Sequence, residues 1–271
     1  MKTSSIPFGC QTYTWQMSFE KYRGELAHII STVGASGMTG IEPEMCMLGK
    51  FAAEPARLRD CLQTSGVTLG ALCLVCDWLE AKENPAERAL ADAAIAILKD
   101  YFPESVLVLC QMPGADRRNL AGRQKNALAC VNAVGARAHG AGLVSAFHPN
   151  SPAGSVFRTA DDYAIMLEGL ASKNVGFAPD AGHIAKGGMD PVKVLRETRG
   201  LVRHVHFKDM DATGQWKEMG RGCIDFRGIV DLLKQANYRG WVMIEDESAF
   251  AEKDPDAVTL ANGKYVRENF R

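Results

Sequence analysis

Four side chains that can bind a metal ion each lie at the end of a separate apolar run of the sequence. The runs span residues 143–148, 174–179, 202–207 and 241–245, and the side chains are His148, Asp180, His206 and Glu245. Two imidazoles and two carboxylates can hold one divalent cation and leave positions open for a substrate. Because imidazole favours transition metals, the sequence predicts one Mn²⁺, Co²⁺ or Zn²⁺ ion in preference to Mg²⁺. His148 could alternatively act as an acid or base rather than as a ligand.

Other residues near the ends of these runs could contact a substrate. His183 follows Asp180 by three residues in "DAGHIAKGGMD", and Lys208 follows His206 by two. The segment "PNSPAGSVFRTADDY" after residue 148 is typical of an active-site loop, although it could also be a purely structural excursion. Trp15 could stack on a sugar face or simply pack in the core. The residues predicted to bind substrate are His183, Lys208, Asn150, Arg158 and Trp15.

Several of these residues also have a plainer interpretation. Asp180 could cap a helix or turn. His204 is expected to be a packed histidine one layer deeper, since residues two apart point to the same side of a strand. Glu247 is expected to be solvated. Of Glu42 and Glu44, one is expected to face the site and the other a helix.

The segments that carry these residues alternate between short apolar runs and longer amphipathic ones. Helical patterns, for example residues 19–37 and 256–270, separate eight strand candidates at 7–12, 39–43, 68–75, 105–110, 143–148, 174–179, 202–207 and 241–245. Strict alternation implies a parallel sheet, and eight such units in 271 residues fit a (β/α)₈ TIM barrel, with one domain over residues 1–271. In such a barrel the carboxyl ends of the strands line the active site. A doubly wound open sheet is the alternative, but no G-x-G-x-x-G follows a strand.

Composition limits the partners. A net charge of -1 and the lack of a long Lys/Arg block argue against nucleic acid and against a membrane surface. No apolar run reaches the roughly 18–20 residues needed to cross a bilayer, and the first residues lack the apolar core of a signal peptide. The settings of Cys73, Cys76, Cys110 and Cys130 argue against disulfides, and the C-x-x-C of Cys73 and Cys76 is typical of buried free thiols. These features favour a cytoplasmic protein, which we expect to be a homo-oligomer.

The motifs around the predicted site resemble those of a known family. The stretches "DAGHIAKGGMDP", "RHVHFKDM", "GRGCIDFRGIVDLLKQANYRGWVMIEDE" and "GCQTYTW" are similar to the sugar phosphate isomerase/epimerase group, the xylose-isomerase-like TIM barrels. The resemblance is strongest over about 140–250 and extends in organisation to the whole chain. It implies a metal-dependent barrel enzyme acting on a small sugar or polyol, but it does not identify the substrate.

The resemblance also implies roles for single residues. In members that resemble ketose 3-epimerases, strands 5 to 8 hold one divalent metal with Glu, Asp, His and Glu. Asp180, His206 and Glu245 match this pattern, whereas His148 stands where a glutamate is expected. Inosose-dehydratase-like members have a histidine-rich strand 5 end that is closer to this one. His183 matches the family's substrate-contacting histidine, and the arginine of the epimerases is absent, with Ala212 at that place.

These inferences lead to a predicted chemistry. A metal-polarised carbonyl acidifies the neighbouring C–H bond, and a base removes the proton to give a metal-stabilised enediolate. Glu245 is the preferred base and Glu44 the second candidate, with His183 and Lys208 binding substrate oxygens. An isomerase or epimerase of a keto-sugar or polyol is the first prediction. A lyase that acts by β-elimination on an inosose or a 3-keto-glycoside is the alternative, and a non-catalytic sugar-binding protein is a third. The charge argues against a DNA-repair endonuclease of the same superfamily.

Overall fold

The computed structural model describes residues 6–270, and in this part of the chain all eight expected strands form. Every pairing among them is parallel. The third strand is interrupted at Gly70, so it carries two labels. The strands are β1 (Phe8–Gln11), β2 (Gly40–Glu42), β3 (Thr68–Leu69) with β4 (Ala71–Cys76), β5 (Val106–Gln111), β6 (Ser145–His148), β7 (Gly176–Phe177), β8 (Val205–Phe207) and β11 (Val242–Ile244).

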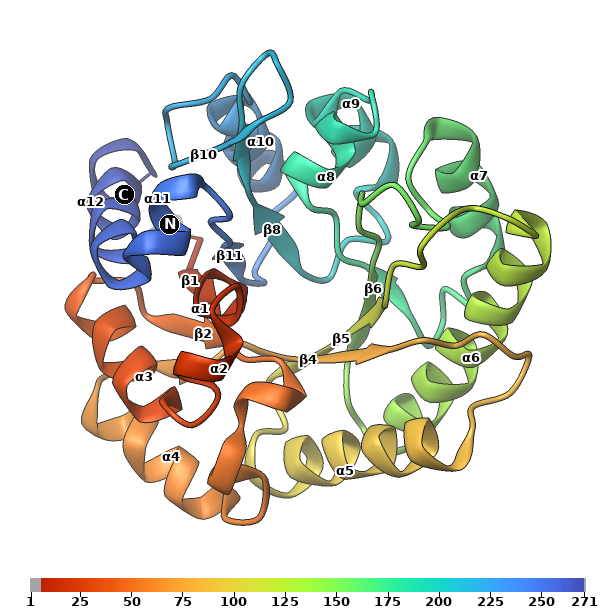
Figure 1. Ribbon diagram of the computed structural model, residues 1–271, viewed down its shortest axis with the longest axis horizontal. Helices are drawn as coiled ribbons and strands as arrows, with labels where there is room; N and C mark the ends of the chain where they lie inside the picture. The colour runs from red at the N-terminus through yellow and green to blue at the C-terminus, as the bar shows by residue number, and fades with distance from the viewer. Residues whose placement is uncertain (1–5, 271) are drawn as a thin grey trace.

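The strands close into a barrel. They pair in the orders β3-β2-β1-β11-β8 and β4-β5-β6-β7. Single parallel bridges join the two sets, Glu44 with Cys73 on one side, and Phe177 with Val202 and Asp180 with His206 on the other. The view down the barrel shows the helices as an outer ring around these strands (Figure 1). The predicted TIM barrel is therefore confirmed, and the open sheet is excluded.

The helices follow the predicted alternation. Helix α5 illustrates why, because Asn84 accepts hydrogen bonds at its start, Pro85 occupies its first turn and Glu87 completes a capping box. The ring contains α2 (Phe19–Tyr22), α3 (Leu26–Ala35), α4 (Pro55–Thr64), α5 (Pro85–Tyr101), α6 (Leu120–Gly140), α7 (Ala160–Gly169), α9 (Pro191–Thr198), α10 (Phe226–Gln235) and α12 (Pro255–Phe270).

Some elements differ from the prediction. The helix expected over residues 19–37 is split into α2 and α3 by a turn at Arg23–Gly24. Additional short elements lie in the loops at the carboxyl ends of the strands. These are the helices α1 (Tyr13–Gln16), α8 (Ala181–Lys186) and α11 (Ala249–Lys253), the 3₁₀ turns Met45–Met47 and Gly49–Ala52, and an antiparallel hairpin of β9 (Asp209–Met210) and β10 (Trp216–Lys217).

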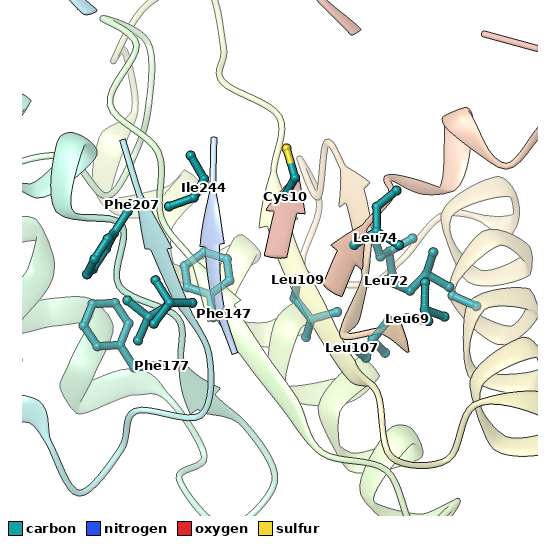
Figure 2. Close-up of a cluster of buried hydrophobic side chains, with 14 of the residues drawn as sticks. Cys10, Leu69, Leu72, Leu74, Leu107, Leu109, Phe147, Phe177, Phe207 and Ile244 are labelled. Atoms are coloured by element: carbon teal, nitrogen blue, oxygen red, sulfur yellow. The ribbon is translucent and has the colours of Figure 1, made fainter. Parts of the chain in front are cut away.

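The core has two parts. The larger apolar cluster packs strands against helices, and Figure 2 shows its strand members, such as Leu72, Leu107 and Phe207. A second cluster of small residues, including Ala71, Val108 and Ala146, alternates with the first along the same strands. Side chains alternate across a strand, so this second set faces the barrel interior. All eight cysteines are free, and within residues 6–270 no helix has the length and apolarity needed to cross a membrane.

Candidate active site

The structure brings the four predicted metal ligands together at the carboxyl end of the barrel. His148 ends β6, Asp180 follows β7, His206 lies in β8 and Glu245 follows β11. One ligand atom from each lies within 4.8 Å of the others, and all four side chains are buried. His148 Nε2 is 3.8 Å from Asp180 Oδ2, and His206 Nδ1 is 3.2 Å from Glu245 Oε2. The strand-end arrangement expected from the sequence is thus realised as a single cluster.

Two buried atoms of this cluster indicate that it fits a cation. Among residues 6–270, His148 Nε2 and Asp180 Oδ2 have no hydrogen-bond partner. Leaving polar atoms buried without partners costs about 1–3 kcal/mol each, and carboxylate and imidazole atoms that converge in this way are suitable ligands for a divalent metal. The donor set therefore fits the metal that the family resemblance implies.

Asp180 both caps a helix and contributes to the cluster. Its Oδ1 accepts a hydrogen bond of 2.6 Å from the His183 backbone at the start of α8, while Oδ2 faces the cluster. Close packing explains why the third residue of "DAGH" is a glycine, since a Cβ at Gly182 would lie 2.7 Å from the Lys208 carbonyl oxygen. The close approach of α8 to Lys208 places His183 above the cluster.

A second buried carboxylate lies one layer below. Glu42 Oε2 accepts hydrogen bonds from His204 Nε2 at 2.6 Å and from His206 Nε2 at 2.8 Å. Burial alone would raise the pKa of Glu42, but the two imidazoles outweigh it and lower the pKa to about 2. With Nε2–H donated to Glu42, His206 presents Nδ1 to the cluster. An outer carboxylate that orients a ligating histidine in this way is a common feature of metal sites.

This layer corrects one prediction. Both glutamates belong to the site, because Glu42 lies inside the barrel and Glu44 lines the pocket above it while accepting a hydrogen bond from Gln16 of α1. His204 occupies the deeper layer that the alternation along the strand predicted, and it is fully buried.

Lys208 is buried beside the cluster. Its side chain is 1% exposed, and Nζ donates to Glu245 Oε1 at 2.6 Å and to Glu247 Oε1. Burial would lower the pKa of Lys208, but the charges of Glu245, Glu247 and Asp180 raise it well above its ordinary value. Glu247 was expected to be solvated; instead it is only 19% exposed and pairs with Lys208.

His183 is held by hydrogen bonds on both ring nitrogens. Its Nδ1 is 2.8 Å from Ser151 Oγ, and its Nε2 is 3.2 Å from Lys208 Nζ. Burial and the Lys208 charge lower the pKa of His183 to about 3. The imidazole is therefore neutral, with Nε2 accepting from the ammonium and Nδ1–H donating to the serine.

A cavity of about 230 Å³ opens above these groups. Its walls combine polar groups with aromatic and apolar ones. Trp216 from β10 lies edge-on to the His183 ring, with 5.7 Å between the two ring centroids. Lys208 Nζ lies 5.2 Å from the centroid of the Trp216 ring. The other walls include Gln11, Tyr13, Gln16, Glu44, Met112, Asn150, Ser151 and Lys186. A pocket with one polar, ion-binding floor and an aromatic wall is suited to a small polyhydroxylated molecule.

Three residues predicted to bind substrate do not line the cavity in the described part of the chain, and one of them is Lys208, which is fully buried beside Glu245. Trp15 is fully buried, and its Nε1 donates to Asp256 Oδ1 at 2.7 Å. Arg158 is half-buried and, within the described residues 6–270, is not part of the cavity lining. Asn150 does line the cavity, although its amide nitrogen donates to the Gln111 carbonyl at 2.7 Å. The sequence did not point to Trp216, Tyr13 or Glu247, because their positions depend on how the loops fold.

The loop that carries Asn150 and Ser151 is anchored by Asp162. This carboxylate accepts hydrogen bonds from the backbones of Arg158 and Thr159 and pairs with Arg117 at 2.7 Å. Burial would raise the pKa of Asp162, but these hydrogen bonds lower it below its ordinary value. The ionised carboxylate therefore holds both the loop and the start of α7.

Replacing Asp162 by asparagine is expected to lower the free energy of unfolding by about 3 kcal/mol at neutral pH, because a largely buried charge pair is broken. The pKa of Asp162 is lower in the folded protein than in the unfolded chain. Its contribution to the free energy of unfolding is therefore fully present above the unfolded-state pKa of about 3.9 and is lost as the pH falls through the folded-state pKa. Denaturant unfolding at several pH values measures this difference, which should shrink below about pH 4. The neighbouring exposed Asp161 is the matched control, and Asp161→Asn should change stability by less than about 0.5 kcal/mol. Equal free energies of unfolding for Asp162→Asn and Asp161→Asn would show that Asp162 does not anchor the loop.

Comparisons with known proteins give the same fold. Inosose dehydratase of Clostridium beijerinckii is 26% identical over 156 residues, which are 51% of this chain and 52% of the relative. Inosose dehydratase of Geobacillus kaustophilus is 31% identical over 131 residues, 42% of this chain and 40% of the relative. The chain thus spans about half the length of the curated relatives it matches.

Solved structures match over nearly the full chain. A probable 3-DHS dehydratase from Bacillus anthracis superposes with a TM-score of 0.76 at 13% identity, covering 98% of this chain and 100% of that one. The 3-keto-D-glucoside 4-epimerase of E. coli gives 0.75 at 18% identity, covering 97% and 99%. The model of the xylose isomerase-like TIM barrel family matches residues 30–268. The chain therefore belongs to the xylose isomerase-like TIM barrel family.

Proposed function

We propose that this protein is a metal-dependent dehydratase of a keto-polyol or keto-sugar. The proposal is carried by the different environments of the three carboxyl groups that line the cavity, Glu44, Glu245 and Glu247. Glu245 and Glu247 belong to possible ligand clusters and pair with Lys208. Among the described residues of the cavity lining, only the carboxyl of Glu44 does neither. A single available proton carrier suits an elimination, and the inosose dehydratases among the relatives support this reaction class.

His148, Asp180, His206 and Glu245 would hold the metal. When bound, a divalent ion would supply a Lewis acid that polarises the substrate carbonyl. The two imidazoles favour Mn²⁺, Co²⁺ or Zn²⁺ over Mg²⁺.

Glu44 replaces Glu245 as the proposed base. Both oxygens of Glu245 are engaged, Oε1 with Lys208 and Oε2 beside His206. Glu44 Oε2 accepts the side-chain hydrogen bonds from Gln16 and Cys46, which leaves Oε1 for the substrate. Burial raises the pKa of Glu44 above its ordinary value, which brings the group closer to the range in which it can both take and return a proton at neutral pH.

The reaction needs one proton carrier. Glu44 takes the proton from the carbon next to the carbonyl, and the electrons of that C–H bond form a C=C bond with charge on the carbonyl oxygen. The positive charge of Lys208, which lies next to His183 of the cavity lining, can stabilise that oxygen. The carbonyl then re-forms, the double bond moves to the α and β carbons as the bond to the β-hydroxyl breaks, and Glu44 returns the proton to the leaving oxygen. The products are an unsaturated ketone and one water molecule, and Glu44 is regenerated.

The test is a product analysis in heavy water. Manganese-loaded protein is incubated with inososes, ketohexoses and 3-keto-glucosides, and the products are identified by NMR and mass spectrometry. We expect loss of water from one of these compounds, and a decrease in kcat of about 100-fold or more in Glu44→Gln with metal content unchanged. No product and no deuterium in any compound would exclude proton abstraction altogether.

Isomerisation or epimerisation is the second candidate. It is favoured by Glu247, a further carboxyl of the lining, which reaches the pocket from the loop after β11. Epimerisation needs a proton to return to the opposite face of the substrate, so a second acid must act. Deuterium at a carbon without loss of water, together with equal defects in Glu44→Gln and Glu247→Gln, would support this reaction instead of dehydration.

The aromatic wall gives a separate prediction. Trp216→Ala is expected to raise KM about tenfold with little change in kcat, because it removes a stacking surface that takes no part in the proposed proton transfer. Trp15→Phe is the matched control, since Trp15 is buried away from the cavity and should lose about 1 kcal/mol of stability without a change in KM. Steady-state kinetics on the substrate found above measures both. If Trp15→Phe raised KM and Trp216→Ala did not, the wall would be assigned to the wrong tryptophan.

A further inference from the structure

The ammonium group of Lys208 lies at the meeting point of three ligand-like atoms. Nζ contacts Glu245 Oε1 at 2.6 Å, His183 Nε2 at 3.2 Å and Glu247 Oε1. The same three residues, without the lysine, form a group whose ligand atoms lie within 4.8 Å of one another and could hold a metal ion. Lys208 therefore occupies a position that could suit a cation.

Glu245 connects this position to the proposed metal centre. Its Oε2 lies with His206 in the four-residue cluster, and its Oε1 binds the ammonium. One carboxylate thus spans two cation positions, as bridging carboxylates do in two-metal sites where the ions are about 3.5–4 Å apart. Glu245 therefore contacts both the four-residue cluster and the Lys208 ammonium.

Charge balance agrees with this arrangement. Asp180, Glu245 and Glu247 line the site and Glu42 lies one layer below, so one divalent ion together with the Lys208 ammonium would offset three of the four negative charges. A buried carboxylate left without a positive partner costs several kcal/mol. Two divalent ions beside the lysine would instead leave excess positive charge.

We propose that Lys208 fills the second cation position of a two-cation site. The protein then takes one divalent ion per chain, and the lysine supplies the fixed positive charge that a second ion would otherwise provide. Removing the lysine side chain should open a site for that second ion, held by His183, Glu245 and Glu247. This inference rests on the proposed metal centre of His148, Asp180, His206 and Glu245.

The experiment measures metal stoichiometry. Wild-type protein, Lys208→Ala, Lys208→Arg and the double variant Lys208→Ala with Glu247→Gln are equilibrated with Mn²⁺, freed of excess ion and analysed by elemental mass spectrometry. We expect one equivalent in the wild type, two in Lys208→Ala, and one in each of the other two proteins. Electron paramagnetic resonance of Lys208→Ala should show a magnetically coupled manganese pair that the wild type lacks.

The outcomes separate this inference from the proposed function. One equivalent in both the wild type and Lys208→Ala would overturn the inference alone, as would two equivalents in the wild type. No bound metal in any of the proteins would overturn the metal centre itself. Lys208→Ser leaves similar space and can hydrogen-bond a water molecule, so it gives the same measurement if the alanine variant fails to fold.

Discussion

Replacing Asp180 by asparagine is expected to lower metal affinity by more than about 100-fold while leaving the fold intact. Loss of a residue that only orients a ligand costs about 10- to 100-fold, and Asp180 offers the cluster a charged oxygen with no other hydrogen-bond partner in the described chain. The asparagine carbonyl can still accept the hydrogen bond from the His183 backbone at the start of α8. Titration with Mn²⁺ and thermal unfolding together measure the two effects.

A comparison with alanine separates the two roles of Asp180. Asp180→Ala should lose metal affinity to the same extent and, in addition, about 1 kcal/mol of stability through the missing helix cap. Asp190 is the matched control, because it caps α9 through backbone hydrogen bonds on the surface. Asp190→Ala should lose stability and keep the metal. Full metal occupancy in Asp180→Asn would show that the cluster is not the metal site.

Replacing Glu42 by glutamine is expected to weaken metal binding by about 10- to 100-fold and to lower the free energy of unfolding by about 3 kcal/mol. The carboxylate oxygen accepts hydrogen bonds from both His204 and His206 and is fully buried. An amide of the same shape carries no charge, so its carbonyl oxygen accepts the hydrogen bond from His206 more weakly and holds the ring orientation less firmly. Calorimetric Mn²⁺ titration and denaturant unfolding measure the two losses.

A spectroscopic measurement distinguishes positioning from simple stability. Nitrogen NMR of the His206 ring should show Nε2 protonated in wild-type protein loaded with a diamagnetic ion such as Zn²⁺, and a changed tautomer population in Glu42→Gln. The exposed Glu25 is the control, because Glu25→Gln should alter neither metal binding nor the ring signals. An unchanged affinity for metal in Glu42→Gln would leave Glu42 as a structural residue only.

The barrel could be predicted because its signals are local. Apolar runs of strand length and amphipathic helices alternate along the chain, and the strands in the structure lie within or close to the predicted ranges. The rule that parallel strands present their carboxyl ends at one edge then placed His148, Asp180, His206 and Glu245 near one another. The interruptions were not visible, since Gly70 and Gly24 could each have been tolerated inside a regular element.

The rest of the site depends on contacts that join distant parts of the chain. Trp15 packs away from the pocket because of Asp256, 241 residues later, and Glu247 is drawn inward by Lys208. Glu42 of β2 contacts His204 and His206, which lie 162 and 164 residues later, only because the barrel closes. Neither residue type nor spacing along the sequence determines these outcomes.

The hairpin that carries Trp216 has a consequence for engineering. Its two strands pair only with each other, and Asp209 holds its far end through the backbone N–H groups of Gly220 and Gly222. The hairpin supplies one wall of the pocket through Trp216, while the barrel supplies the floor, and the buried Met219 anchors the segment to the core. Exchanging residues 211–218, which spares Met219, is expected to change the size of the compounds that fit the pocket without altering the four-residue cluster of its floor.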